Sequence, residues 1–224
     1  MALRLKKVGT RGEHTREAIL RTAERRFADR GFTDTRLEDI AGELGITRPA
    51  LVYYFTSKRE LYDCVLENVF GELVDRVRAV SAAADAPNEQ IEAMVSTWIA
   101  YAGERPTFVR IYLREVANAT PTMEPAITRY TDKLNEVLIE VLRAGEAQGL
   151  FRPVDPMHLV SSFVGATVQY IGVLPTLGLD SSFDPLEKER LAAHREDVLA
   201  NVRRILEPGK PRPLRAADRR RRSR

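Results

Sequence analysis

Residues 35–58 constrain the fold of this 224-residue chain more than any other segment. Four apolar residues recur there at the i, i+3, i+4, i+7 spacing that places side chains on one face of a helix: Leu37, Ile40, Ala41 and Leu44. Gly45 follows, where a left-handed residue ends a helix without strain. Thr47 suits the N-cap of a second helix, and Pro49 falls in its first turn. The segment therefore predicts a helix-turn-helix, with residues 48–54 as the second, recognition helix.

Two hydroxyl residues in this segment stand three positions before a glutamate, which is the spacing of a capping box. Thr35 precedes Glu38 in this way, and Ser57 precedes Glu60. A cation directly follows each of the three expected caps: Arg36, Arg48 and Lys58. A cation at a helix N-terminus opposes the helix dipole by roughly 0.3–1 kcal/mol, whereas anions bind there, so we interpret the three as phosphate contacts. The alternative is three unrelated surface cations in a chain that is 30% charged.

Residues 15–62 resemble the DNA-binding domain of the TetR family of bacterial transcriptional regulators. The matching residues are Thr15-Arg16-Glu17-Ala18-Ile19-Leu20, Ala23, Phe27, Gly31-Phe32, Ile40-Ala41, Gly45-Ile46 and Tyr54-Phe55-Thr56-Ser57-Lys58-Arg59-Glu60-Leu61. Two positions depart from the commonest pattern of the family, because Pro49 replaces the usual glycine and Val52 stands where tyrosine is common. Both positions face the DNA in the family, so the departures concern sequence preference rather than DNA binding.

The resemblance implies a role for each exposed residue of the motif. Arg48 would read a base edge, most naturally guanine through a bidentate contact. Pro49, Ala50 and Val52 would offer apolar contact to thymine methyl groups. The other residues would hold phosphates, which positions a protein without specifying sequence: Thr35, Arg36, Thr47, Tyr53, Tyr54 and Lys58. For Tyr54 the alternative is a core ring whose hydroxyl only reaches the surface.

Charge divides the chain into three parts. The net charge is +4 over residues 1–58 and +7 over residues 208–224, which leaves −8 between them. The end with the helix-turn-helix is therefore basic and the middle acidic. We predict an N-terminal arm and helix-turn-helix domain at 1–62, a helical effector-binding and dimerisation domain at 63–207, and a disordered basic tail at 208–224. The tail would add salt-sensitive DNA affinity or act only as a solubilising end.

The middle of the chain has helical patterning and no convincing period of two, so an all-α fold is expected. Turn residues separate helices predicted at about 57–84, 88–103, 106–118, 125–148, 156–174 and 185–206. The uncharged stretch 159–179 is long enough to span a bilayer. It contains three glycines and several polar residues and lacks basic flanks, so we interpret it as a helix buried against protein.

The resemblance further implies a homodimer, in which the last two long helices of each subunit form a four-helix interface. Two DNA-binding domains on one palindromic operator would multiply weak single contacts. The expected contact residues, besides Phe163, are Gly165, Ala166, Val168, Gly172, Leu191, Val198, Val202 and Ile205.

Members of the family typically hold a ligand inside the helical domain. The aromatic or polarisable candidates here are Met94, Trp98, Tyr101, Phe108, Tyr112, Tyr130, Phe163 and Tyr170. For each of them, ordinary packing in a helical core is the alternative. No basic cluster accompanies them, so we expect an unknown effector that is a moderately apolar small molecule.

The sequence lacks the motifs of catalysis and metal binding. His14, His158 and His194 are scattered, and there is no HExxH, P-loop or G-x-S-x-G pattern. We therefore expect no enzymatic activity, no metal, no cofactor and no membrane span. The single cysteine, Cys64, indicates a small buried filler, and with an N-terminus unlike a signal peptide it favours the cytoplasm.

The preferred hypothesis is a homodimeric transcriptional regulator, a repressor that a small-molecule effector releases from DNA. One alternative is a DNA-binding protein of the same fold that acts structurally or through a protein partner. The other is an interaction module that has lost DNA binding.

Overall fold

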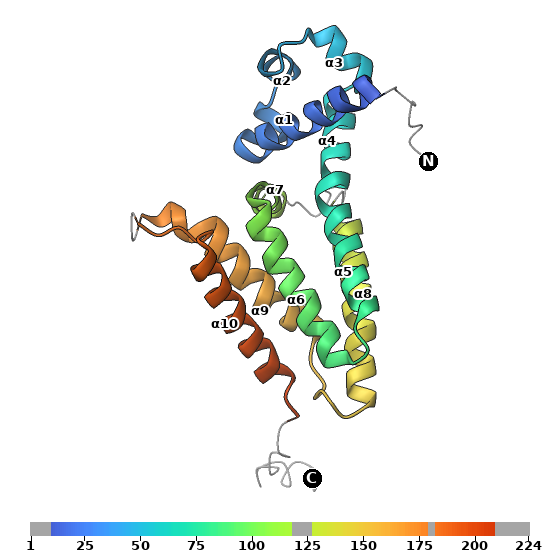
Figure 1. Cartoon of the computed structure of the whole chain (residues 1–224), viewed down its shortest axis with the longest axis vertical. Coiled ribbons are helices and arrows are strands. Elements are labelled where there is room, and N and C mark those ends of the chain that lie inside the picture. The colour runs from blue at the N-terminus through green and yellow to red at the C-terminus, as the bar shows by residue number, and fades with distance from the viewer. Residues whose placement is uncertain (1–9, 118–126, 179–181, 209–224) are drawn as a thin grey trace, which may run out of the picture.

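The computed structural model describes residues 10–117, 127–178 and 182–208, which form helices and no strand. Helices α1–α3 gather at one end of the long axis, and the remaining helices form a bundle beyond them (Figure 1). The elements are α1 (Thr10–Asp34), α2 (Leu37–Glu43), α3 (Arg48–Tyr54), α4 (Lys58–Leu66), η1 (Glu67–Gly71), α5 (Glu72–Ala83), α6 (Pro87–Glu104), α7 (Pro106–Ala117), α8 (Thr128–Ala147), α9 (Pro156–Val168), η2 (Gln169–Val173), η3 (Leu174–Leu177) and α10 (Lys188–Leu206). The expected all-α fold is confirmed.

The turn between α2 and α3 forms as its sequence predicts. Gly45 has φ 64°, the left-handed conformation that glycine adopts without a Cβ penalty. The N–H of Ile46 then donates to the carbonyl of Ala41 at 3.0 Å, which satisfies a carbonyl at the end of α2. Thr47 caps α3 by accepting the N–H of Ala50 at 3.3 Å. These bonds hold α3 against α2 at a fixed angle.

A long rod connects the two ends of the molecule. It consists of α4, the π-helical turn η1 and α5, and it corresponds to the helix predicted at 57–84. The sequence did not predict the π turn, in which one extra residue is inserted into the helix. The carbonyl of Val69 in this turn accepts the hydroxyl of Tyr101 from α6 at 2.6 Å. The rod is thereby tied to α6 at the level of η1.

The uncharged segment forms α9, η2 and η3, and α9 packs against α6, α8 and α10. Residues 156–177 are long and apolar enough to cross a membrane by length and composition, a test that core helices also pass. Only 22% of the tested window is buried within one chain. One protomer alone therefore buries only part of this segment, and the predicted burial on most sides, which included a dimer partner, stays a prediction. The predicted tail lies outside the described residues beyond residue 208.

Candidate nucleic-acid interface and internal cavity

The outer face of α3 presents an exposed group of predicted contact residues. Tyr53 has 61% of its surface accessible, which is high for an aromatic side chain. Its ring packs edge-on against Tyr54 with 5.3 Å between ring centres. The other exposed members of the predicted set are Arg36, Thr47, Arg48, Pro49 and Ala50. The structure thus leaves six of the ten predicted DNA contacts exposed, five of them on α3 or at its N-cap and the sixth, Arg36, at the N-cap of α2.

Arg48 lies against an acidic neighbour in this protein. Its Nε is 2.7 Å from Oε1 of Glu38, and both side chains are about 60% exposed. An exposed ion pair of this kind contributes roughly 0–1 kcal/mol, so it holds Arg48 only weakly. A phosphate or a guanine edge can therefore displace the carboxylate.

Thr35 is buried, contrary to its predicted role. Its hydroxyl donates to the carbonyl of Gly31 at 2.7 Å and to that of Arg26 at 3.2 Å. The N-cap of α2 is Arg36, which makes no side-chain capping bond. The prediction that Thr35 caps α2 is wrong, because Gly31, at φ 78°, turns the end of α1 back over this hydroxyl. The phosphate contact expected at the Thr35–Arg36 helix start stays a prediction.

The ammonium of Lys58 likewise binds groups of its own chain. Its ammonium donates to the carbonyls of Phe32 at 2.8 Å, Thr33 at 3.1 Å and Thr35 at 3.1 Å. The same nitrogen lies 4.5 Å from the centre of the Phe32 ring. Lys58 therefore fastens α4 to the end of α1, and its role as a phosphate contact stays a prediction.

Val52 and Tyr54 are half-buried and pack against the core. For Tyr54 this agrees with the alternative of a core ring that only reaches the surface. For Val52 only part of the side chain is exposed, and its contact with a thymine methyl group stays a prediction. Pro49 and Ala50 are the predicted apolar contacts that remain fully open.

Acidic residues of α2 neutralise several cations of α1. Arg25 and Arg26 hydrogen-bond the two carboxylate oxygens of Glu43 at 2.8 and 2.7 Å, and Arg30 lies 3.3 Å from Asp39. The hydrogen bonds from Arg25 and Arg26 lower the pKa of Glu43. Part of the positive charge of residues 1–58 is therefore neutralised by ion pairs that hold α1 to α2. Arg48 of α3 is itself paired with Glu38 of α2, and Arg36 is an exposed cation at the N-cap of α2.

A cavity of about 240 Å³ lies between the rod and helices α6–α9. Phe70 of η1 and Val77 of α5 form one side of it. Four of the eight predicted ligand contacts line it: Met94, Trp98, Tyr112 and Phe163. The remaining wall comes from α8 and α9, whose residues the sequence analysis did not select: Thr131, Leu134, Asn135, Leu138, Met157, Val160 and Val164.

The other four predicted ligand contacts do not line this cavity. Tyr101 and Phe108 are fully buried in the core, and Tyr130 is buried with its hydroxyl on Glu67 at 2.5 Å. Tyr170 packs face to face on His194 of α10, with 4.0 Å between ring centres. Core packing, the alternative for each candidate, is what the structure shows for these four. The residues missed on α8 and α9 follow the i, i+3, i+4 spacing, a signal that could have identified them.

The cavity wall is apolar apart from a few neutral groups. The Nε1–H of Trp98 is buried, and no residue of the described chain accepts a hydrogen bond from it. Burial raises the pKa of Tyr112, so its phenol is neutral near pH 7. No charged side chain lines the cavity within the described ranges.

Helix α7 connects this wall to the DNA-binding end. Arg114 donates from Nε to the carbonyl of Ala28 at 2.9 Å and from Nη2 to that of Asp29 at 2.5 Å, both near the end of α1. Thr107, which lies five residues before Tyr112 on α7, donates a hydrogen bond to Glu24 of α1. A displacement of α7 would therefore be transmitted directly to α1.

A second link lies beside it. Arg105, between α6 and α7, donates two hydrogen bonds to Glu24 at 2.8 and 2.5 Å and one to Glu72 at 2.7 Å. Its guanidinium also contacts the hydroxyl of Tyr101 at 2.9 Å. Arg105 thus joins α1, α5 and α6 at a single point.

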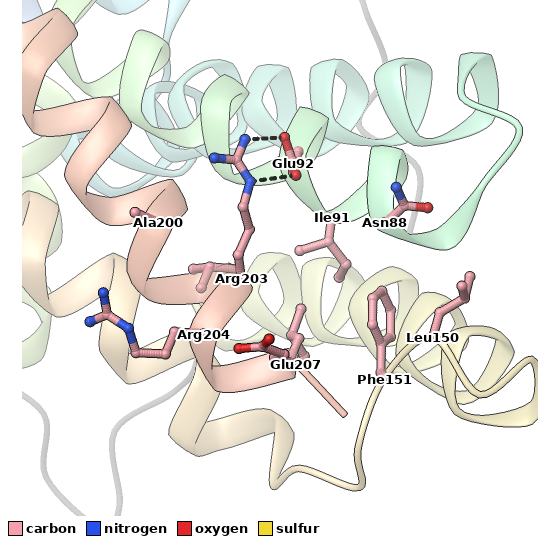
Figure 2. A pocket seen from close by; sticks show the side chains of 11 residues that line it. Asn88, Ile91, Glu92, Leu150, Phe151, Ala200, Arg203, Arg204 and Glu207 are labelled. Atoms are coloured by element: carbon pink, nitrogen blue, oxygen red, sulfur yellow. Dashed lines mark hydrogen bonds and ion pairs between the residues drawn. The ribbon is translucent and has the colours of Figure 1, made fainter. Parts of the chain in front are cut away.

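A larger hollow, about 480 Å³, lies at the opposite end of the molecule, between α6, the α8–α9 connection and α10. Figure 2 shows Arg203 extending across to Glu92, with two hydrogen bonds of 2.7 and 2.6 Å between them. Phe151 and Ile91 form its apolar side. It is an open groove without a described contact to α1, so we do not assign the effector to it.

The predicted dimer contacts fall into two groups. Val168, Val198 and Val202 are buried inside the protomer, and Gly172 lies against Val109 and Leu113 of its own chain. The three valines have little surface left for a partner and Gly172 is half-buried, so the four assignments as dimer contacts stay predictions. Leu191 packs over Gly103 and is only partly exposed. Gly165 is open, and Ala166 and Ile205 are half-exposed.

Two family descriptions match the chain. Residues 19–65 match "Bacterial regulatory proteins, tetR family", and residues 87–209 match "Tetracyclin repressor-like, C-terminal domain". The transcriptional regulator RutR of Escherichia coli strain K12 is 27% identical over 160 residues, 71% of this chain and 75% of RutR. The transcriptional repressor KstR2 of Mycolicibacterium smegmatis is 29% identical over 154 residues, 68% of this chain and 75% of the repressor.

Solved structures show the same fold. The ketosteroid transcriptional regulator KstR2 of Mycobacterium tuberculosis superposes with a TM-score of 0.68 at 22% identity, covering 90% of this chain and 97% of that one. AibR, solved with isovaleryl coenzyme A and operator DNA, gives 0.66 at 24% identity, covering 87% and 99%. Together with the helix-turn-helix and the two family matches, which span most of its length, these likenesses show that the chain belongs to the TetR family of DNA-binding transcriptional regulators.

Proposed function

We propose that this regulator is a cytoplasmic homodimer that represses transcription from a palindromic operator and leaves the DNA when a small molecule fills the cavity beside Trp98. The observation that carries the proposal is the position of α7. The helix borders the cavity through Tyr112 and contacts α1 through Thr107 and Arg114. One helix therefore contacts both the wall of the cavity and the DNA-binding end.

The coupling has a simple thermodynamic form. A ligand that binds more tightly to a state with displaced α1 helices lowers DNA affinity by that difference in binding free energy, and by no more. Ligand filling the space next to Tyr112 would bias α7, and the bonds from Arg114 to Ala28 and Asp29 would carry the bias to α1. The alternative, regulation without a small molecule, requires no such cavity.

The proposed dimer uses the open faces of α9 and α10. Gly165 has no atom within 4 Å of the position where a Cβ would lie, and only 22% of the apolar window around it is fully buried. A partner against this face would place two α3 helices on half-sites about 34–36 Å apart, one DNA turn. Sedimentation over a dilution series should give the mass of a dimer. A monomer at micromolar concentration would contradict this part of the proposal.

The DNA-binding part is tested by a mobility-shift assay with the DNA upstream of the protein's own gene. Arg48→Ala should weaken binding by about 1–3 kcal/mol and relax the preference at one base pair. An exposed arginine far from α3, such as Arg204 on α10, gives the matched control, Arg204→Ala. If Arg48→Ala binds as tightly and as selectively as the unaltered protein, Arg48 does not read a base.

A further inference from the structure

The densest positive charge in the chain is not used by the function proposed above. Residues 209–224, here called the basic segment, carry eight Lys or Arg and one Asp, and they include the run Arg219–Arg222. The family matches cover residues 19–65 and 87–209, so neither assigns the basic segment a role. Runs of like charge often serve as contact segments for a partner of opposite charge.

The basic segment starts at the end of the molecule opposite the helix-turn-helix. At the end of α10, Arg203 bonds Glu92 near the start of α6, and the carbonyl of Leu206 accepts the N–H of Arg152. α6 begins shortly after the rod ends, whereas α1–α3 gather at the other end of the rod (Figure 1). The rod spans residues 58–83, so at about 1.5 Å per residue it is about 39 Å long.

This position limits what the basic segment can reach. A fully extended chain advances at most about 3.6 Å per residue, so Arg219 lies no more than about 40 Å from Pro208. DNA on α3 lies beyond the whole rod and beyond the helix-turn-helix, which adds at least one helix diameter of about 10 Å. Even a straight segment would bring only its last residues to that DNA. The run Arg219–Arg222 therefore cannot rest on the operator that its own subunit reads.

The surface at the end of α10 does not neutralise the basic segment. The carboxylate of Glu92 already accepts two hydrogen bonds from Arg203, which lower its pKa (Figure 2). Besides this pair, Arg204 and Glu207 are the charged residues that line the hollow there. Arg152 adds a further cation, held on the carbonyl of Ile205 at 2.5 Å. The exit is thus slightly basic and favours a partner outside the chain.

The composition of the basic segment matches the phosphates of a duplex. Guanidinium groups bind phosphate oxygens through two parallel hydrogen bonds. The segment has no aromatic residue on which an unpaired base could stack, and Leu214 is its one large apolar side chain, too little to enter a lipid surface. Duplex DNA presents one negative charge per about 1.7 Å of its axis. Contact with its backbone therefore suits a run of arginines.

We propose that the basic segment binds the phosphates of a second DNA duplex, so that the regulator on its operator also holds another stretch of DNA at its opposite end. The inference rests on the proposed operator binding through α3 and on the proposed dimer. Because both α3 helices of that dimer face one DNA, both α10 ends point away from it. Two basic segments would then meet the second duplex without reading its sequence.

A capture assay with the full chain tests the proposal. A short operator duplex is immobilised, loaded with protein and washed, and a labelled duplex of unrelated sequence is then added. We expect the second duplex to be retained, with an affinity that falls steeply as salt rises.

Two variants of equal charge locate the contact. The first changes the arginine run to glutamine: Arg219→Gln, Arg220→Gln, Arg221→Gln and Arg222→Gln. The second changes four exposed cations of α5 and α8: Arg78→Gln, Arg129→Gln, Lys133→Gln and Arg143→Gln. The first should weaken capture of the second duplex at least about tenfold and reduce its salt slope by about 3–4 for each segment in contact. The second should leave capture unchanged within about twofold.

The arginine-run variant should bind the short operator duplex alone as tightly as the unaltered protein does, measured by mobility shift. Weaker binding there would place the basic segment on the operator and overturn the proposal. Equal capture by the two variants would overturn it as well. Tighter segment-dependent binding to phosphatidylserine-containing vesicles, or to double-stranded RNA of the same length, would identify another partner and have the same consequence.

Arg48→Ala separates this proposal from the proposed function. With the protein itself immobilised, Arg48→Ala should lose the preference for the operator but keep the capture of unrelated duplex that depends on the arginine run. If the unaltered protein shows no operator preference, the proposed function fails while the capture by the basic segment is still measured. If operator binding is intact and no second duplex is captured, this inference alone fails.

Discussion

The DNA-binding end and the proposed effector cavity differ in how completely their hydrogen-bonding groups find partners and their space is filled. At the DNA-binding end, the hydroxyl of Thr35 and the ammonium of Lys58 each reach two or more backbone carbonyls, and Thr47 and Ser57 cap their helices. Around the cavity, space is unfilled and the indole N–H of Trp98 has no acceptor within the described ranges. The first region is built to keep one shape, whereas the second has binding energy still available for a ligand.

The largest effect expected from this comparison is on stability. Phe27 is 1% exposed and packs edge-on against Tyr62 at 4.8 Å between ring centres, so Phe27→Ala should cost about 3–5 kcal/mol of unfolding free energy. Phe163 is half-buried and already borders empty space, so Phe163→Ala should cost about 1–2 kcal/mol. Denaturant unfolding measures both. Equal losses would show that the cavity wall is as tightly packed as the DNA-binding end.

The link between the two regions gives the next largest effect. Arg105→Ala leaves Glu24, whose side chain is 10% exposed, without its guanidinium, so we expect a loss of about 2–4 kcal/mol. The matched control is Arg110→Ala, which breaks an exposed ion pair with Asp29 and should cost under about 1 kcal/mol. If the two variants unfold at the same denaturant concentration, Arg105 is not a structural joint.

Sequence patterns predicted local structure well and long-range contacts poorly. Gly45, Thr47 and Ser57 behave as predicted, because each acts on backbone groups within a few residues of itself. Thr35 has the same pattern as Ser57, but the kink at Gly31 brings a carbonyl to its hydroxyl. Gly31 is only four residues away, but the capping-box spacing does not describe the kink that turns its carbonyl toward Thr35.

The cavity illustrates the same limit. Trp98 and Tyr101 lie three positions apart on α6, yet one borders the cavity and the other is sealed in the core with its hydroxyl on Val69. Their separation depends on where α8 and α9 cross, which only the folded chain determines. For the same reason, helix patterning could not distinguish the buried Val198 and Val202 from residues left open on α10.

A comparison of Lys58 with Arg36 distinguishes a cation that stabilises the fold from one that binds DNA. Lys58→Met keeps the length of the side chain but removes three hydrogen bonds, two to α1 and one to Thr35 just after it, so stability should fall by about 1–3 kcal/mol. Arg36→Met, at an exposed site, should change stability by less than about 0.5 kcal/mol. In the mobility shift, Arg36→Met should reduce the salt dependence by about one counter-ion per subunit, and Lys58→Met should not. A reversed pattern would restore the phosphate role predicted for Lys58.

The smallest effect concerns the competition for Arg48. Glu38 holds this side chain through an exposed contact of 2.7 Å and also places a negative charge beside the DNA. Glu38→Gln should therefore tighten operator binding by up to about 1 kcal/mol with little change in stability. Glu189→Gln on α10 alters the net charge equally but lies on an exposed face of another helix, so it should leave the affinity unchanged. If Glu38→Gln and Glu189→Gln bind the operator with equal affinity, the net charge of the protein sets that affinity. The release of Arg48 from Glu38 then contributes nothing to operator binding.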